Sequence, residues 1–118
     1  MNLPAIQERF LCLSGLSPQE AQVWLGLCEE AMQELSAQVL REEESAGALL
    51  NAAAGALAFY RYTVAQSSGV ESEVSAGEVR VTKSLAGMEA ARRLWQEARR
   101  AVSPYLCDTE FYFKQVQS

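Results

Sequence analysis

The chain has 118 residues, of which 49% are hydrophobic and 21% charged, a composition typical of one globular domain and unlike that of a disordered segment. Its net charge of -5 and its pI near 4.7 argue against a general nucleic-acid binder, which requires a basic surface. The absence of histidine removes the commonest general base and the usual transition-metal ligand. We therefore predict one domain over residues 1–118, without a catalytic or metal site.

Two helices are predicted in the first third of the chain. Apolar residues recur at steps of three and four over 3–14 before Gly15 stops the run, as on one face of a helix. A second helix, over 17–40, begins with Ser17, a proline and Glu20, which have the spacing of an N-cap with a capping box. The apolar stripe of this second helix consists of Ala21, Trp24, Leu25, Cys28, either Ala31 or Met32, Leu35 and Val39.

Two further helices are predicted, over 46–66 and 86–103. The earlier of the two has small or apolar residues on several faces and carries Gly55 near its middle, so we expect a central helix that its neighbours approach closely. The later one has an apolar stripe that includes Trp95 and ends before a proline. The predicted fold class is mainly α, a four-helix domain.

Between these two helices, residues 67–84 lose the helical period. Glu71–Ser75 and Glu78–Thr82 alternate as strands do on either side of an Ala-Gly pair, which predicts a β-hairpin-like loop. The loop is either a simple connection or a ribbon that docks on a partner. In the second case the contacting residues are Val79, Arg80, Val81 and Lys83.

The C-terminal tail, residues 105–118, is predicted to be extended and contains Phe111, Tyr112 and Phe113. Aromatic residues at this density are out of place on a free polar terminus, so we expect a protein surface to cover them. They either fold back on their own bundle or insert into a groove of a neighbouring molecule, and their alternation favours the second slightly.

Charge is unevenly distributed along the chain. Residues 17–44 carry seven glutamates and one arginine, a local net charge of -6, whereas residues 80–100 carry six cations and two glutamates, a local net charge of +4. These segments pair between subunits, pair within one molecule, or form two separate solvated faces.

Three cysteines form an odd set without CxxC spacing, which predicts neither a disulfide framework nor a zinc site. Cys12 and Cys28 fall on helix positions where we expect buried thiols in a reducing compartment. No signal peptide is evident, and the apolar run Ala46–Tyr60 is shorter than the roughly 20 residues of a membrane span. We expect a protein that is intracellular at synthesis and does not cross a membrane.

Motifs for chemistry are lacking. GxxxxGK[ST] and GxGxxG do not occur, so no cofactor and no small-molecule substrate are predicted. Glu29, Glu30 and Glu34 share the polar face of a helix, where solvated carboxylates are far commoner than catalytic ones. Phe59–Tyr62 fits either a platform for single-stranded nucleic acid or a helix interface, and the acidic chain favours the interface, with Arg61 near a helix C-terminus.

Four segments of the chain occur in a distinctive order. They are LPAIQERFLCLSGLSPQEAQVWLGLCEEAMQEL, the alanine-rich helix ending in ALAFYRY, the loop SAGEVRVTKS and the final helix EAARRLWQEA. This order resembles the head-tail connector, or neck adaptor, proteins of tailed phages and prophages.

That resemblance implies a structural protein without enzymatic activity, which forms a homo-oligomeric ring with portal and tail-completion proteins in the virion neck after assembly in the bacterial cytoplasm. DNA passes nearby without specific binding, consistent with an acidic protein that makes few phosphate contacts. The resemblance places the partner-binding surfaces around Val79–Lys83 and Phe111–Phe113. The alternative is a small regulatory or scaffolding helical protein that binds one bacterial or prophage partner.

Overall fold

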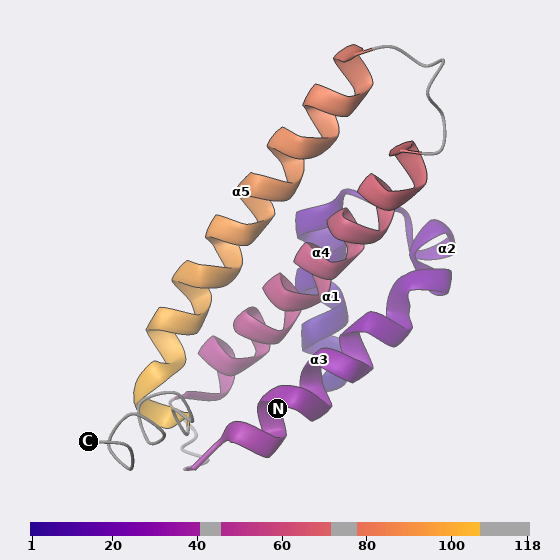
Figure 1. The fold of residues 1–118 in the computed structure, drawn as a ribbon. Helices are drawn as coiled ribbons and strands as arrows, with labels where there is room; N and C mark the ends of the chain where they lie inside the picture. The colour runs from indigo at the N-terminus through magenta and orange to yellow at the C-terminus, as the bar shows by residue number, and fades with distance from the viewer. Residues whose placement is uncertain (41–45, 72–77, 107–118) are drawn as a thin grey trace, which may run out of the picture.

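The computed structural model describes residues 1–40, 46–71 and 78–106, and this part of the chain is mainly helical (Figure 1). Two short 3-10 helices lie between or after the α-helices. In chain order the elements are α1 (Leu3–Ser14), α2 (Pro18–Ala21), η1 (Gln22–Trp24), α3 (Leu25–Gln38), α4 (Gly47–Glu71), α5 (Glu78–Val102) and η4 (Ser103–Tyr105). The four-helix character and the ranges of the first and third predicted helices are confirmed, apart from a longer C-terminal end on α4.

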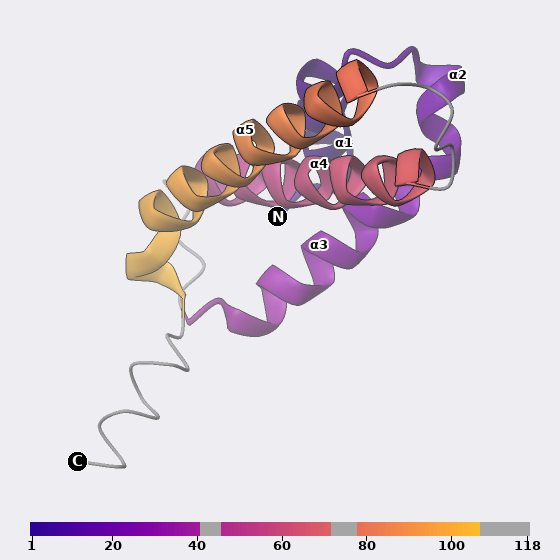
Figure 2. The ribbon, with the colours of Figure 1, turned by 45° about the horizontal axis from the view of Figure 1, so that its top comes forward.

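Helix α4 is the centre of the domain. Helices α1, α3 and α5 each pack against it, with α5 running beside α4 over most of its length (Figures 1 and 2). Helices α3 and α5 lie on different sides of α4 and diverge from each other, as the second view shows (Figure 2). The prediction of a central helix surrounded on several sides is confirmed.

The core is formed by small and apolar side chains. No polar or charged residue is buried among the described residues, so hydrophobic burial and packing hold the helices together. The buried cluster consists of Ile6, Phe10, Ala21, Cys28, Ala31, Leu35, Ala46, Leu50, Ala53, Ala54, Leu57, Ala58, Val102 and Leu106. Most of the predicted apolar stripe of residues 17–40 is therefore core, as expected.

Close packing between α1 and α4 depends on Gly55. A Cβ atom at this position would lie 2.7 Å from Cβ and from Cγ of Arg9 and 3.2 Å from the carbonyl oxygen of Ile6. Real Cβ contacts do not reach 2.7 Å, because atoms at that distance repel strongly. The glycine thus lets the backbone of α4 approach α1, as the sequence predicts.

The predicted second helix begins where expected but is not continuous. The amide of Glu20 donates to Oγ of Ser17 at 3.2 Å, and this hydroxyl donates to Oε1 of Glu20 at 2.9 Å. The N-cap is confirmed, although Glu20 reaches the serine hydroxyl and not the backbone amide expected of a capping box. A 3-10 turn at η1 then separates α2 from α3, and it places Trp24 edge-on against Tyr62.

Removal of this cap has a measurable cost. We expect Ser17→Ala to lower the free energy of unfolding by about 1 kcal/mol, because the amide of Glu20 loses its acceptor. Urea unfolding followed by circular dichroism measures the change. Ser17→Asn keeps a side-chain acceptor and should remain close to the wild-type stability; equal losses in both variants would contradict the capping role.

The predicted hairpin is wrong in its second half. Residues Glu78–Thr82 form the start of α5 instead of a strand, and the only bridge outside helices in the described residues joins Val39 to Leu106. Valine and threonine lose at most about 0.7 kcal/mol per residue in a helix relative to alanine, whereas an isolated two-stranded hairpin is marginal in water. These residues therefore extend helix α5, which already packs along α4, and do not form a strand. Residues 72–77 lie outside the described part.

The predicted tail starts within η4, and its aromatic residues lie outside the described part. Tyr105 belongs to η4, Leu106 is buried against the core, and residues 107–118, with Phe111, Tyr112 and Phe113, follow beyond the described residues. The backbone amide of Leu40 donates to the carbonyl oxygen of Tyr105 at 2.8 Å. This hydrogen bond joins η4, which follows α5, to the segment that follows α3.

Candidate functional site

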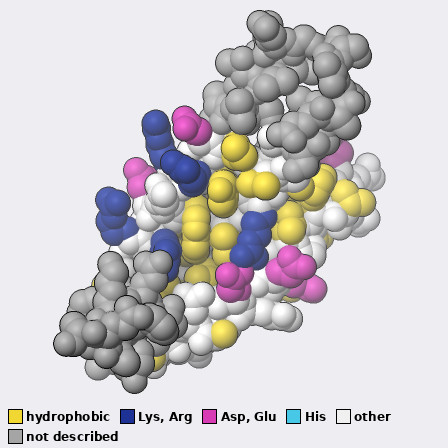
Figure 3. Space-filling view, viewed as in Figure 1, with side chains coloured by type: hydrophobic (Ala, Val, Ile, Leu, Met, Phe, Trp, Pro, Cys, Tyr) yellow, Lys and Arg dark blue, Asp and Glu magenta, His cyan; other side chains and the backbone are white. Residues whose placement is uncertain are grey.

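A groove of about 350 Å³ lies where α3, α4 and α5 meet. Figure 3 shows this side of the molecule, with hydrophobic side chains along α4, cations mainly over α5 and carboxylates near α3. The groove is lined by Glu34, Leu35 and Gln38 of α3, Leu57, Tyr60 and Arg61 of α4, and Trp95 and Arg99 of α5.

The lining of the groove is more polar than apolar. Leu35 and Leu57 are 2% and 5% exposed, and each belongs to the core cluster. Tyr60 and Trp95 are half-buried and line the same groove.

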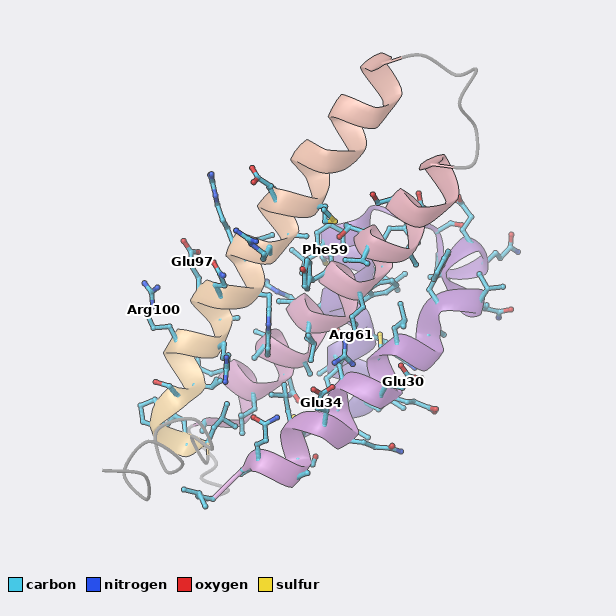
Figure 4. All side chains as sticks on the ribbon, viewed as in Figure 1. Glu30, Glu34, Phe59, Arg61, Glu97 and Arg100 are labelled. Carbon is cyan, nitrogen blue, oxygen red and sulfur yellow. The ribbon has the colours of Figure 1, made fainter. Side chains whose placement is uncertain are left out.

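Charged side chains form the rim. The guanidinium of Arg61 donates to Oε2 of Glu34, so α4 and α3 are joined by an ion pair (Figure 4). The pair is solvent-accessible, with 33% and 47% of the two side chains exposed, and is therefore worth about 0 to 1 kcal/mol. Arg99 is exposed, and no described carboxylate forms an ion pair with it.

The orientation of Arg61 corrects one expectation. The sequence predicts this cation near the C-terminus of its helix, but α4 continues to Glu71, too far for a favourable dipole interaction, which fades within the last turn. Arg61 instead bridges to α3. Helix spacing explains its place in the groove, because Leu57 and Arg61 are four residues apart and share one face, as do Trp95 and Arg99 on α5.

The residues Phe59–Tyr62 do not form a single platform. Tyr60 and Arg61 line the groove, whereas Tyr62 packs edge-on against Phe10 and Trp24, with ring centroids 5.7 and 4.9 Å apart. Phe59 stacks on Tyr62 at 6.3 Å. The predicted helix interface is confirmed for this aromatic cluster. Burial, and then the charge of Glu20, raise the pKa of the Tyr62 hydroxyl.

The carboxylates of α3 have the solvated environment that the sequence predicts. Glu29, Glu30 and Glu34 are exposed, and the described residues contain no group of three metal-ligating side chains. Glu34 is the one carboxylate in the groove, where it is engaged by Arg61. The groove therefore combines one ion pair, one further cation and two half-buried aromatic side chains.

The two described cysteines differ sharply. Cys28 is 0% exposed, as expected, but Cys12 is exposed and the prediction of burial is wrong for it. Cys12 follows the buried Phe10 by two helical steps of about 100° each. Cys12 therefore lies on the opposite side of α1 from Phe10. Burial, and then the charge of Glu29, raise the pKa of the Cys28 thiol from 9.0 to about 11.

Thiol reactivity should follow this difference. In a Cys107→Ser background, we expect Cys12 to react with a disulfide reagent at pH 8 at the rate of an open thiol, and Cys28 to react only through opening of the fold. Absorbance of the released thiolate counts the fast and slow groups. The Cys12→Ser variant should lose the fast phase alone, and a fast Cys28 would contradict its burial.

The raised pKa of Cys28 also gives a pH dependence. Its protonated form is favoured in the folded state, so its contribution to stability is complete below pH 9.0 and is lost as pH rises toward about 11. We expect the stability of the wild type to fall more steeply over this range than that of Cys28→Ala. Urea midpoints at several pH values measure the two slopes, and parallel slopes would refute the assignment.

Four of the predicted interface residues lie away from the groove, and the other three, Phe111, Tyr112 and Phe113, lie outside the described residues. Val79, Arg80, Val81 and Lys83 belong to the first two turns of α5, whereas Trp95 and Arg99 lie three turns or more further along that helix. The sequence analysis did not predict the groove. A signal was present, because on both α4 and α5 a groove residue is followed four positions later by an arginine of the groove, Leu57 by Arg61 and Trp95 by Arg99.

None of the described helices combines the length and apolar character needed to span a bilayer. Comparison with protein families, curated proteins and solved structures finds no match for this chain.

Proposed function

We propose that this chain is a structural adaptor of a tailed phage or prophage particle, which joins portal and tail-completion proteins as a subunit of a ring-forming head-tail connector. The observation that carries the protein-binding part is the opposite charge of two outer helices, with exposed carboxylates on α3 and exposed arginines on α5. The phage part is supported by the order of the sequence segments. Since Glu78–Thr82 is helical, the helical segments carry that resemblance more than the loop does.

Charge distribution supports contact with other protein molecules. Helix α3 bears the exposed carboxylates Glu29, Glu30 and Glu34, whereas α5 bears four exposed arginines against two glutamates between Glu89 and Arg100. Opposite charges on two outer helices favour an arrangement in which α3 of one copy faces α5 of the next. This arrangement would repeat from subunit to subunit in a ring.

The start of α5 is the proposed contact with the portal or tail. Val79, Arg80, Val81 and Lys83 lie at the end of the α4–α5 pair that is remote from η4 (Figure 1). A partner that approaches this end of the pair would meet the first turns of α5.

The test is reconstitution with the portal protein encoded in the same genome. Negative-stain images of the mixture should show an added ring on the portal, and the Arg80→Glu/Lys83→Glu variant should form it less well. Arg80→Lys/Lys83→Arg is the matched control, because it keeps both positive charges and should form the ring as the wild type does. Repeated absence of binding by the wild type would refute the connector function.

Capture of partners from the host tests the alternative. Recovery of one regulator or enzyme, without virion proteins, would identify a regulatory or scaffolding protein with a single partner. The gene neighbourhood provides an independent check, since a connector gene is expected between head genes and tail genes.

A further inference from the structure

The groove belongs to a wider face of the molecule whose two edges carry opposite charge. On α5, Trp95 and Arg99 line the groove, and Arg92 lies on the same side because it precedes them by three and seven residues. On α3, Glu34 lines the groove, and Glu30 lies one helical turn earlier on the same side. The four charged side chains are exposed, with cations over α5 and carboxylates near α3 (Figure 3). We call this surface the charged face.

Helix α4 runs between the two edges, antiparallel to both α3 and α5 (Figure 1). Its residue Tyr60 lines the groove, and Val64, with 37% of its area exposed, lies one turn further along the same side. Because α4 is antiparallel to its neighbours, Glu30, Val64 and Arg92 all lie toward the same end of the bundle from the groove. Each is about one helical turn from a groove residue, so the charged face continues beyond the groove with a carboxylate, an apolar side chain and a cation.

Such a face is complementary to itself. A two-fold axis parallel to α4 turns a second copy so that its cation edge meets the carboxylate edge of the first, while positions along α4 keep their level. Arg92 of each copy then faces Glu30 of the other, and the pair occurs twice, as in any isologous interface. Glu34 already pairs with Arg61 of its own chain. The groove lining is more polar than apolar, so complementary charge directs this contact more than burial of apolar area does.

We propose that the isolated protein forms a two-fold dimer through the charged face, with α3 of each copy against α5 of the other and the two α4 helices between them. The ring proposed above pairs the same two helices from subunit to subunit. The dimer is therefore the form of the protein before contact with the portal, and its separation exposes the ring contacts. The dimer itself does not rest on the connector function, because it follows from the charges and packing of the described residues.

Sedimentation velocity of the full-length wild-type protein tests the proposal. We expect a dimer at low salt and a shift toward the monomer at high salt, because dissolved ions screen exposed charge pairs. A wild type that stays monomeric at low salt would overturn the proposal, as would a dimer whose dissociation constant is independent of salt. A series of species larger than the dimer would show that copies join head to tail and would overturn the two-fold arrangement.

Charge reversal tests which residues meet. Glu30→Arg and Arg92→Glu should each raise the dissociation constant of the dimer by about tenfold or more, because each brings like charges together twice. An equimolar mixture of the two variants should dimerise as the wild type does, since every contact between the two different chains again joins opposite charges. A mixture that stays monomeric would overturn the pairing.

Glu29→Arg and Arg93→Glu are the matched controls. Each makes the same change of charge one position along its helix, about 100° further from the groove, and should leave the dissociation constant unchanged. Circular dichroism confirms that the four variants are folded. If the controls weaken the dimer as much as Glu30→Arg and Arg92→Glu do, net charge decides the association and the charged face is not the interface.

These results are distinguishable from failure of the connector function. A protein that forms the salt-dependent dimer but adds no ring to the portal retains this inference and loses the proposed function. A protein that is monomeric in isolation yet forms the ring retains the proposed function and loses this inference.

Discussion

Replacing Phe10 with alanine is expected to lower the free energy of unfolding by about 3 to 5 kcal/mol, the usual range when a buried phenylalanine is truncated. Phe10 is 0% exposed and is the largest fully buried side chain of the described core. Its ring also packs edge-on against Tyr62 at 5.7 Å, and that contact disappears with it. A domain of this size typically has about 5 to 15 kcal/mol of stability, so the variant loses a large part of the total.

Urea unfolding measured by circular dichroism tests this expectation. Val23→Ala is the matched control, since Val23 is 82% exposed and surface substitutions usually change stability by no more than about 0.5 kcal/mol. A loss below about 1 kcal/mol for Phe10→Ala, similar to that of surface variants, would mean that α1 does not pack on α4 as described.

Gly55→Ala is expected to destabilise the protein by about 1 to 3 kcal/mol, the typical cost of an extra methyl group forced into a packed interior. The new Cβ would lie 2.7 Å from the first two side-chain carbons of Arg9. These carbons are close to the backbone, so rotation of the arginine head group does not remove the clash and α1 must move. The gain in helix propensity of about 1 kcal/mol is smaller than this cost.

Gly87→Ala provides the control with the opposite sign. Gly87 lies within α5, and an added Cβ there meets no atom within 4 Å. The same substitution should therefore stabilise the protein by about 0.5 to 1 kcal/mol. Thermal unfolding of the two variants separates the effects, and stabilisation by Gly55→Ala would disprove the close approach of α1 and α4.

Helical period and capping chemistry made much of the fold predictable. The step of three and four residues located α1, and the Ser17 cap located the start of the second helical region, because both depend only on neighbouring residues. The alanine content and Gly55 likewise predicted the central position of α4. Local signals failed where the helical and extended conformations differ little in local energy. Residues Glu78–Thr82 are such a case, because their alternation suits a strand although they extend a helix that packs on α4.

The groove was harder to predict because it depends on three helices at once. Tyr60, Arg61, Trp95 and Arg99 each have a plausible local explanation in sequence, and only the packing angles of α3 and α5 around α4 bring them together. Cys12 shows the same limit on a smaller scale. Its helix was predicted correctly, but the side on which Cys12 lies follows from which face of α1 meets α4.

Burial on all sides of the middle of α4 limits which substitutions this protein can accept during evolution. Six successive residues, 53–58, are all buried, and the five helical steps of about 100° between them go round the whole circumference of a helix. No direction around this segment is free for a larger side chain, so the spacing of the neighbouring helices is set by alanine and glycine together with Leu57. Substitutions in α4 that leave the core undisturbed are thereby directed to exposed positions outside this segment, such as Leu49 and Gln66, where new binding properties can arise.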